Sequence, residues 1–165
     1  MSHTIAAVST GNQISAIGII RLTGDDCIAV AGKVFTLTSN KPLDTAPDRK
    51  LLLGQLHDKQ GRVIDSCCVV VSRGPRSYTG EDTVEFHCHG SPAVLAAGLE
   101  SLYIAGARPA QRGEFTKRAF LNGKLDLPQR IKRHISTTAK AIGKDITAYK
   151  ALKWGYIQPI NKSYK

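Results

Sequence analysis

No apolar run in this sequence of 165 residues approaches the roughly 20 residues of a membrane-spanning helix, which argues against a transmembrane protein. The N-terminus has no basic region followed by an apolar core, so we expect no secretory signal and a cytoplasmic location. The four cysteines form no CxxC pair, which is typical of reduced thiols in the cytosol rather than of a disulfide framework.

The sequence motifs of nucleotide chemistry and hydrolysis are also missing. There is no GxxxxGKS or GxxxxGKT phosphate loop, no GxSxG elbow, no HExxH motif and no dinucleotide-binding glycine pattern. The nearest approach to a phosphate loop is Gly143-Lys144, where Thr138 replaces the first glycine and Asp145 replaces the hydroxyl residue. We therefore expect that this chain alone hydrolyses neither GTP nor ATP and has no GTP, potassium or magnesium site.

The positive charge of the chain is concentrated near its C-terminus. Lys and Arg number 23 against 13 Asp and Glu, a net charge of +10. Residues 1–129 hold 14 of the basic and 12 of the acidic residues, a net of +2, whereas residues 130–165 hold nine basic residues against Asp145 alone. The body is nearly neutral, so the net charge of the chain does not by itself indicate nucleic-acid binding.

Strand and helix patterns alternate along the body and indicate an α+β fold. Apolar, β-branched or alternating segments predict strands over 5–8, 14–22, 51–56, 63–72 and 83–89. Helical spacing and cap residues predict helices over 25–35, 91–106 and 114–121. Residues 39–49 and 73–82 are rich in turn-forming residues and are expected to be loops.

The strand expected over 83–89 carries the first candidate site residues. Alternation places Glu85, His87 and His89 together on one face. The two histidines and Glu85 would suit zinc, but no spaced partner pair completes such a site, so we expect no metal. Glu85 would also suit the guanidine-like edge of a pterin ring, whose two N–H groups a carboxylate accepts in parallel. A solvated surface glutamate is the alternative.

Two cations are further candidates. Arg21 ends the Ile-rich strand at a Thr-Gly turn, and Lys124 follows the last expected helix of the body. Either could contact an anion such as a glutamyl carboxylate. Both could equally be ordinary surface charges, and from composition and spacing alone the two interpretations stay open.

Four motifs, in order along the chain, resemble one family. They are IGIIRLTG at 17–24, SYTGED at 77–82, VEFHCHG at 84–90 and GEFTKRAFLNGKLDL at 113–127. Over roughly residues 4–129 they resemble the N-terminal domain of the bacterial and organellar tRNA-modification GTPases of the TrmE family, also called MnmE.

The resemblance implies a fold, a ligand and partners. The fold would be an α+β domain like the tetrahydrofolate-binding domains of aminomethyltransferases. Residues 1–127 would bind 5-formyltetrahydrofolate, a reduced folate, and form a homodimer. Carried over by motif, the folate contacts fall on Arg21, Glu85 and Lys124; no catalytic residue is carried over. Full-length members act as GTPases with a flavoprotein partner, MnmG or GidA, on the wobble uridine of tRNA.

Two departures from the family pattern stand out. The loop at 10–16 lacks the usual Pro/Gly-rich stretch, and Ser91 stands where a second glycine is common. After Gln129 the expected Ala/Glu-rich helix is replaced by a Lys-rich segment. We expect residues 128–165 to be an atypical basic tail, poorly ordered or weakly helical, that arises from truncation, frameshift or fusion.

Two other functions compete with the folate-binding module. One is a stand-alone folate-dependent one-carbon transfer protein of the aminomethyltransferase type, which would need a catalytic residue near the one-carbon group. The other is a tRNA-binding adaptor that uses the basic tail, which predicts a steep salt dependence of RNA binding. The neutral body and the few aromatic residues of the tail disfavour the adaptor.

Overall fold

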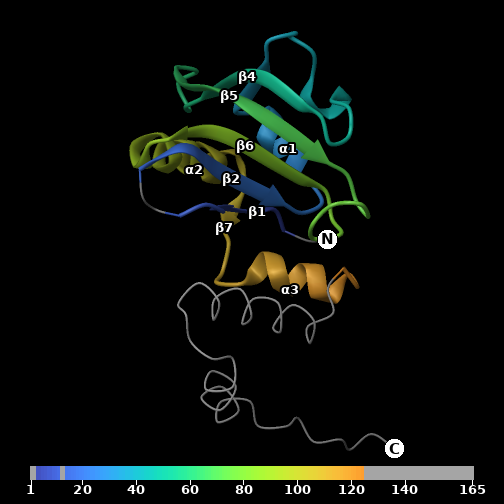
Figure 1. Cartoon of the computed structure of the whole chain (residues 1–165). Coiled ribbons are helices and arrows are strands. Elements are labelled where there is room, and N and C mark those ends of the chain that lie inside the picture. Colours follow the sequence, from blue (N-terminus) through green and yellow to red (C-terminus); the bar gives the residue numbers. More distant parts are fainter. Residues whose placement is uncertain (1–2, 12–13, 125–165) are drawn as a thin grey trace, which may run out of the picture. The chain divides into compact units, whose positions relative to one another are not determined.

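The computed structural model describes residues 3–11 and 14–124 (Figure 1). The chain divides into two units, Met1–Lys124 and Leu125–Lys165, and every described residue lies in the first. The predicted basic tail over 128–165 lies outside the described residues, so its state and the predicted boundary after residue 127 stay predictions.

A seven-stranded sheet forms the framework of the first unit. Its strands are β1 (Ile5–Val8), β2 (Ser15–Thr23), β3 (Phe35–Leu37), β4 (Leu51–His57), β5 (Val63–Ser72), β6 (Thr83–Gly90) and β7 (Arg108–Pro109). The spatial order is β3-β4-β5-β6-β2-β1-β7. All neighbouring pairs are antiparallel except β1 and β7, which are parallel. The sheet therefore brings β2 and β6, which are distant in sequence, side by side.

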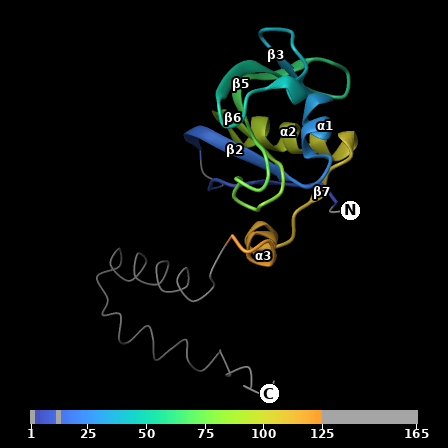
Figure 2. The ribbon, with the colours of Figure 1, turned by 90° about the vertical axis from the view of Figure 1, so that its right-hand side faces the viewer.

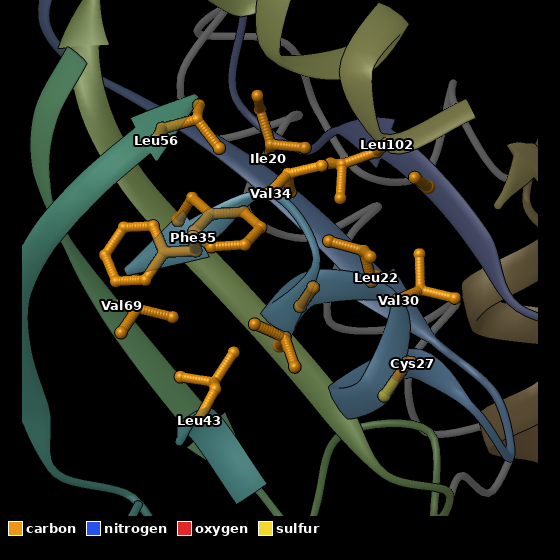
Figure 3. Close-up of a cluster of buried hydrophobic side chains, with 14 of the residues drawn as sticks. Ile20, Leu22, Cys27, Val30, Val34, Phe35, Leu43, Leu56, Val69 and Leu102 are labelled. Atoms are coloured by element: carbon orange, nitrogen blue, oxygen red, sulfur yellow. The ribbon is translucent and has the colours of Figure 1, made fainter. Parts of the chain in front are cut away.

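Two helices cover one face of this sheet (Figure 2). They are α1 (Cys27–Gly32) and α2 (Pro92–Ala105); a 3-10 turn spans Leu43–Thr45, and α3 (Glu114–Leu121) follows β7. The inward side chains of the strands meet α1 and α2 in a continuous apolar core, which includes Ile20, Leu22, Phe35 and Leu102 (Figure 3). The opposite face, called the outer face below, carries the other side chains of each strand.

A glycine allows α2 to lie close against the sheet. A methyl group added at Gly98 would lie 2.7 Å from Cδ1 of Ile20 and 2.9 Å from Cδ2 of Leu56. Only hydrogen fits at this position without displacing core side chains, so Gly98 sets the separation between α2 and strands β2 and β4.

The structure confirms the mixed helix-and-strand organisation, with corrections at short elements. The predicted helix over 25–35 ends at Gly32, and Phe35 instead starts the edge strand β3, where it pairs with Leu56 and packs against Phe86 at 5.1 Å between ring centroids. Strand β7 was not predicted. Ser91 stands at the N-cap of α2 with Pro92 in the first turn, as expected, although its hydroxyl makes no capping bond. None of the helices over the described residues is long and apolar enough to cross a membrane.

Candidate functional site

The candidate site lies on the outer face, where β2 and β6 run side by side. Arg21 of β2 and Glu85 of β6 are direct cross-strand neighbours. The inward neighbours in the sequence, Ile20, Leu22, Val84 and Phe86, are fully buried, so alternation fixes Arg21 and Glu85 on the outer face. The sequence pattern predicted this orientation for Glu85, and the structure confirms it.

Arg21 and Glu85 form an ion pair. Nε of Arg21 donates to Oε1 of Glu85 at 2.6 Å, and each side chain keeps 25% of its surface exposed. The second oxygen, Oε2, lies 3.6 Å from Nε2 of His87, and that ring nitrogen is buried without a hydrogen-bond partner. Each carboxylate oxygen accepts two hydrogen bonds, so Glu85 keeps accepting capacity beyond the Arg21 contact.

Two aromatic rings flank the Arg21 guanidinium. Its Cζ lies 5.1 Å from the ring centroid of Tyr78, in the loop before β6, and 5.9 Å from that of Phe115 on α3. Both distances suit cation–π attraction. The hydroxyls of Tyr78 and Thr116 lie 3.3 Å apart and connect the loop to α3. The site therefore combines a carboxylate, a guanidinium and two flat apolar surfaces.

Sequence reasoning did not select Tyr78 and Phe115, although both fall within the quoted motifs. The usable signal was an aromatic residue in a short polar loop and another at the start of a polar helix. Neither position belongs to a periodic apolar pattern, so a core role was not required by the sequence.

Hydrogen bonds fix the loop 73–82 over the end of the sheet. The hydroxyl of Thr79 is buried 2.7 Å from that of Thr23, and the side-chain amide of Asn122 donates to the Thr79 carbonyl at 2.8 Å. A methyl group at Gly80 would lie 3.3 Å from Cγ of Lys124. The same loop thus lies close to the Lys124 side chain at Gly80 and places Tyr78 beside Arg21.

The three residues predicted to contact folate therefore do not all have the same surroundings. Arg21 and Glu85 form an ion pair, whereas Lys124 is exposed and its side chain lies close to the loop at Gly80. The family motifs group these three residues as expected folate contacts. The structure shows that Arg21 and Glu85 contact each other, and the role of all three in folate binding stays a prediction.

Charged side chains anchor α3 beside this site. The Glu114 carboxylate accepts hydrogen bonds from Arg108, Arg118 and the Gln111 backbone, and Arg118 also donates to Glu81 at 2.9 Å. The Arg108 guanidinium, together with the Gln111 and Arg118 donors, lowers the pKa of Glu114 from 4.5 to about 2. This network fixes the first turn of α3, which carries Phe115.

The two histidines considered for zinc have different surroundings. Nδ1 of His89 lies 2.7 Å from Oδ1 of Asp65, whereas His87 faces Glu85. Over residues 3–11 and 14–124, one group of three potential metal ligands lies within 4.8 Å of one another, and it consists of Asp65, Cys67 and Cys88. It contains neither histidine.

A separate hollow of about 540 Å³ lies away from the predicted residues. Its lining includes Lys33, His57, Lys59 and Ile104, near the ends of α1 and α2. Both ring nitrogens of His57 are buried without a hydrogen-bond partner. We favour the Arg21–Glu85 site for the main function because it carries the residues of the family motifs.

Comparison with known proteins places the chain in a family. Residues 4–124 match the family model described as "GTP-binding protein TrmE N-terminus". The tRNA modification GTPase MnmE of Thermus thermophilus is 48% identical over 130 residues, covering 78% of this chain and 29% of the relative. That of Symbiobacterium thermophilum is 45% identical over 127 residues, covering 77% of this chain and 28% of the relative.

A third relative aligns further along the chain. The MnmE of Leptospira interrogans is 41% identical over 152 residues, which cover 90% of this chain and 30% of the relative. An alignment of that extent includes part of the segment after residue 129. The chain spans less than a third of the length of these curated relatives. With the model match over most of its length, the chain belongs to the family of the TrmE N-terminus.

Proposed function

We propose that this chain is the reduced-folate-binding and dimerisation module of a tRNA wobble-uridine modification GTPase, with an aminomethyltransferase-like fold. The observation that carries the proposal is the Arg21–Glu85 pair beside Tyr78 and Phe115, on the motifs shared with the family. For the full-length protein, we propose that it hydrolyses GTP, acts with the flavoprotein MnmG or GidA, and modifies tRNA.

The chemistry of Glu85 suits the pterin end of a folate. The amino group and ring N–H of a pterin form a flat donor edge, which a carboxylate accepts in two parallel hydrogen bonds. Arg21 donates a hydrogen bond to Oε1 of Glu85 at 2.6 Å and so restricts the orientation of the carboxylate. Nε2 of His87, 3.6 Å from Oε2, is a further polar neighbour of this carboxylate. Tyr78 and Phe115 supply flat surfaces for the ring.

The other end of a folate is anionic. The glutamyl carboxylate would be attracted by Lys124, an exposed residue whose side chain lies close to Gly80 of the loop. The loop 73–82 would then lie along the ligand. Its hydrogen bonds to Asn122 and Thr23 would keep the pterin end and the glutamyl end of the site at a fixed separation.

The outer face supports the proposed homodimer. Beyond the Arg21–Glu85 pair it exposes large apolar side chains, with Ile17, Leu51 and Leu53 between 57% and 59% exposed. A second copy that covers this face would remove that area from water. In sedimentation velocity, Leu53→Glu is expected to shift the protein to monomer. Val63→Glu is the control, because Val63 is also an exposed apolar residue but, by alternation, lies on the same side of β5 as the buried residues of that strand. A monomeric wild type would contradict dimerisation.

Titration calorimetry with 5-formyltetrahydrofolate tests the folate proposal. The full chain is expected to bind, and Glu85→Ala is expected to weaken binding by about 1–3 kcal/mol, because the pterin donors lose their acceptor. Glu100→Ala, an exposed glutamate on α2, controls for the loss of a negative charge. Equal affinities of the wild type and Glu85→Ala would refute the assignment of Glu85.

A further inference from the structure

Two cysteines and an aspartate meet in the core away from the proposed folate site. Cys67 of β5 and Cys88 of β6 both point to the inner side of the sheet and are 4% and 2% exposed. Since Cys68 pairs with His87 in the antiparallel register, Cys67 lies opposite Cys88. Their sulfur atoms are 3.8 Å apart, and the Asp65 carboxylate lies within 4.8 Å of both.

We propose that Asp65, Cys67 and Cys88 form a binding site for a thiophilic divalent metal ion of the zinc class. A zinc–sulfur bond of about 2.3 Å and a tetrahedral angle place two thiolate sulfurs roughly 3.8 Å apart. The Cys67–Cys88 pair has this separation without a metal. A mixed set of thiolate and carboxylate ligands is one that zinc accepts.

Binding requires no oxidant or reductant. Each cysteine S–H bond breaks as a metal–sulfur bond forms, and the two protons leave to water, while a carboxylate oxygen of Asp65 donates a lone pair to the metal. Three protein ligands leave one tetrahedral position, which a water molecule fills.

His89 positions the aspartate. Its backbone N–H donates to Oδ2 of Asp65 at 2.9 Å, and its Nδ1 lies 2.7 Å from Oδ1. Asp65 is buried, with 8% of its surface exposed, whereas 74% of the His89 side chain is exposed. A buried carboxylate needs such partners, and a hydrogen bond from a second residue to a metal ligand is a common feature of metal sites.

Spacing in the sequence does not reveal this group. Cys67 and Cys88 are 21 positions apart, and Asp65 and Cys67 are separated by one residue, so no CxxC or HxxxH pattern arises. The group is created by the register of β5 against β6. Two thiols alone would be ordinary core residues; the buried carboxylate beside them gives the cluster a donor set suited to a cation.

Cobalt titration of the full chain, after removal of metal with a chelator, tests the proposal. Tetrahedral Co²⁺ bound to thiolates gives visible bands and a near-ultraviolet thiolate-to-cobalt charge-transfer band. We expect one Co²⁺ per chain with both signals, and full displacement by Zn²⁺. Cys67→Ser and Cys88→Ser are expected to lose the charge-transfer band. Cys68→Ser, on the same strand but facing outward, is expected to retain it.

His89→Ala keeps the test decisive if a core variant fails to fold. Because His89 is exposed, this variant should retain the wild-type circular dichroism, and it is expected to bind Co²⁺ at least about tenfold more weakly with the charge-transfer band preserved. Absence of the band in the folded wild type would overturn the proposal, as would its loss in Cys68→Ser. A mass two hydrogens lower under metal-free, non-oxidising conditions, with the disulfide mapped to Cys67 and Cys88 by peptide analysis, would also overturn it, because the two proposed ligands would then be bonded to each other.

Discussion

Replacing Glu114 by Gln should uncouple α3 from the body of the domain. Glu114 accepts hydrogen bonds from Arg108, Arg118 and the Gln111 backbone, and its side chain is 11% exposed. A fall of its pKa from 4.5 to about 2 corresponds to at most about 3 kcal/mol of stabilisation by linkage. Arg108 is 43% exposed, and solvent screening reduces this to about 1–2 kcal/mol.

The contribution of Glu114 has a defined pH dependence. The folded-state pKa lies below the unfolded one, so the stabilisation is fully present above pH 4.5 and is lost as pH falls through about 2. Urea unfolding of the wild type and Glu114→Gln should therefore differ by about 1–2 kcal/mol at pH 7 and by less than half of that near pH 3.

A control separates the Glu114 network from a general charge effect. Glu100→Gln removes a carboxylate from an exposed position on α2 and is expected to change stability by less than about 0.5 kcal/mol at either pH. A Glu114→Gln difference that is the same at pH 7 and pH 3 would refute the linkage reasoning, because it would trace the loss to packing rather than to the ionised carboxylate.

Three further outcomes are expected. Gly54→Ala should destabilise the domain by about 1–3 kcal/mol in thermal or urea unfolding, because the added Cβ would lie 2.4 Å from Cε1 of Phe35 and from the Thr36 carbonyl oxygen. Gly11→Ala is the control, because a Cβ at that position has no atom within 4 Å; equal effects of the two substitutions would contradict the packing argument. Deletion of residues 130–165 should leave the affinity for 5-formyltetrahydrofolate unchanged in calorimetry, since the proposed contacts end at Lys124; a large loss would assign ligand contacts to the deleted segment. The purified chain should release no phosphate from GTP above the buffer rate, because its sequence has no phosphate loop; turnover that survives removal of contaminating GTPases would contradict this.

Strands with one buried face were predictable from the sequence. Alternation over 83–89 identified which side chains of β6 face inward, and Phe86 and Val84 are indeed fully buried. Short edge elements were not predictable. Phe35 continues the apolar spacing of α1, so local pattern favoured a helix, but pairing with Leu56 and packing on Phe86 stabilise a strand.

The site was predictable in part, for a physical reason. Glu85 and its orientation follow from the period of one strand, whereas its contact with Arg21 depends on the pairing of β2 with β6, which no local pattern specifies. The approach of Tyr78 and Phe115 to Arg21 depends on the loop 73–82 and on α3, which contact each other only in the folded chain. The Cys67–Cys88 pair depends on the register of β5 and β6 in the same way.

The central claim is that a reduced folate lies over the Arg21–Glu85 pair, and its most direct test is the location of the bound ligand by nuclear magnetic resonance. Nuclear Overhauser effects would be measured between the pterin-ring protons of 5-formyltetrahydrofolate and the side chains of the labelled full chain. The account predicts contacts to the rings of Tyr78 and Phe115. Saturable binding with contacts instead to His57 and Ile104, which line the separate hollow, would contradict it.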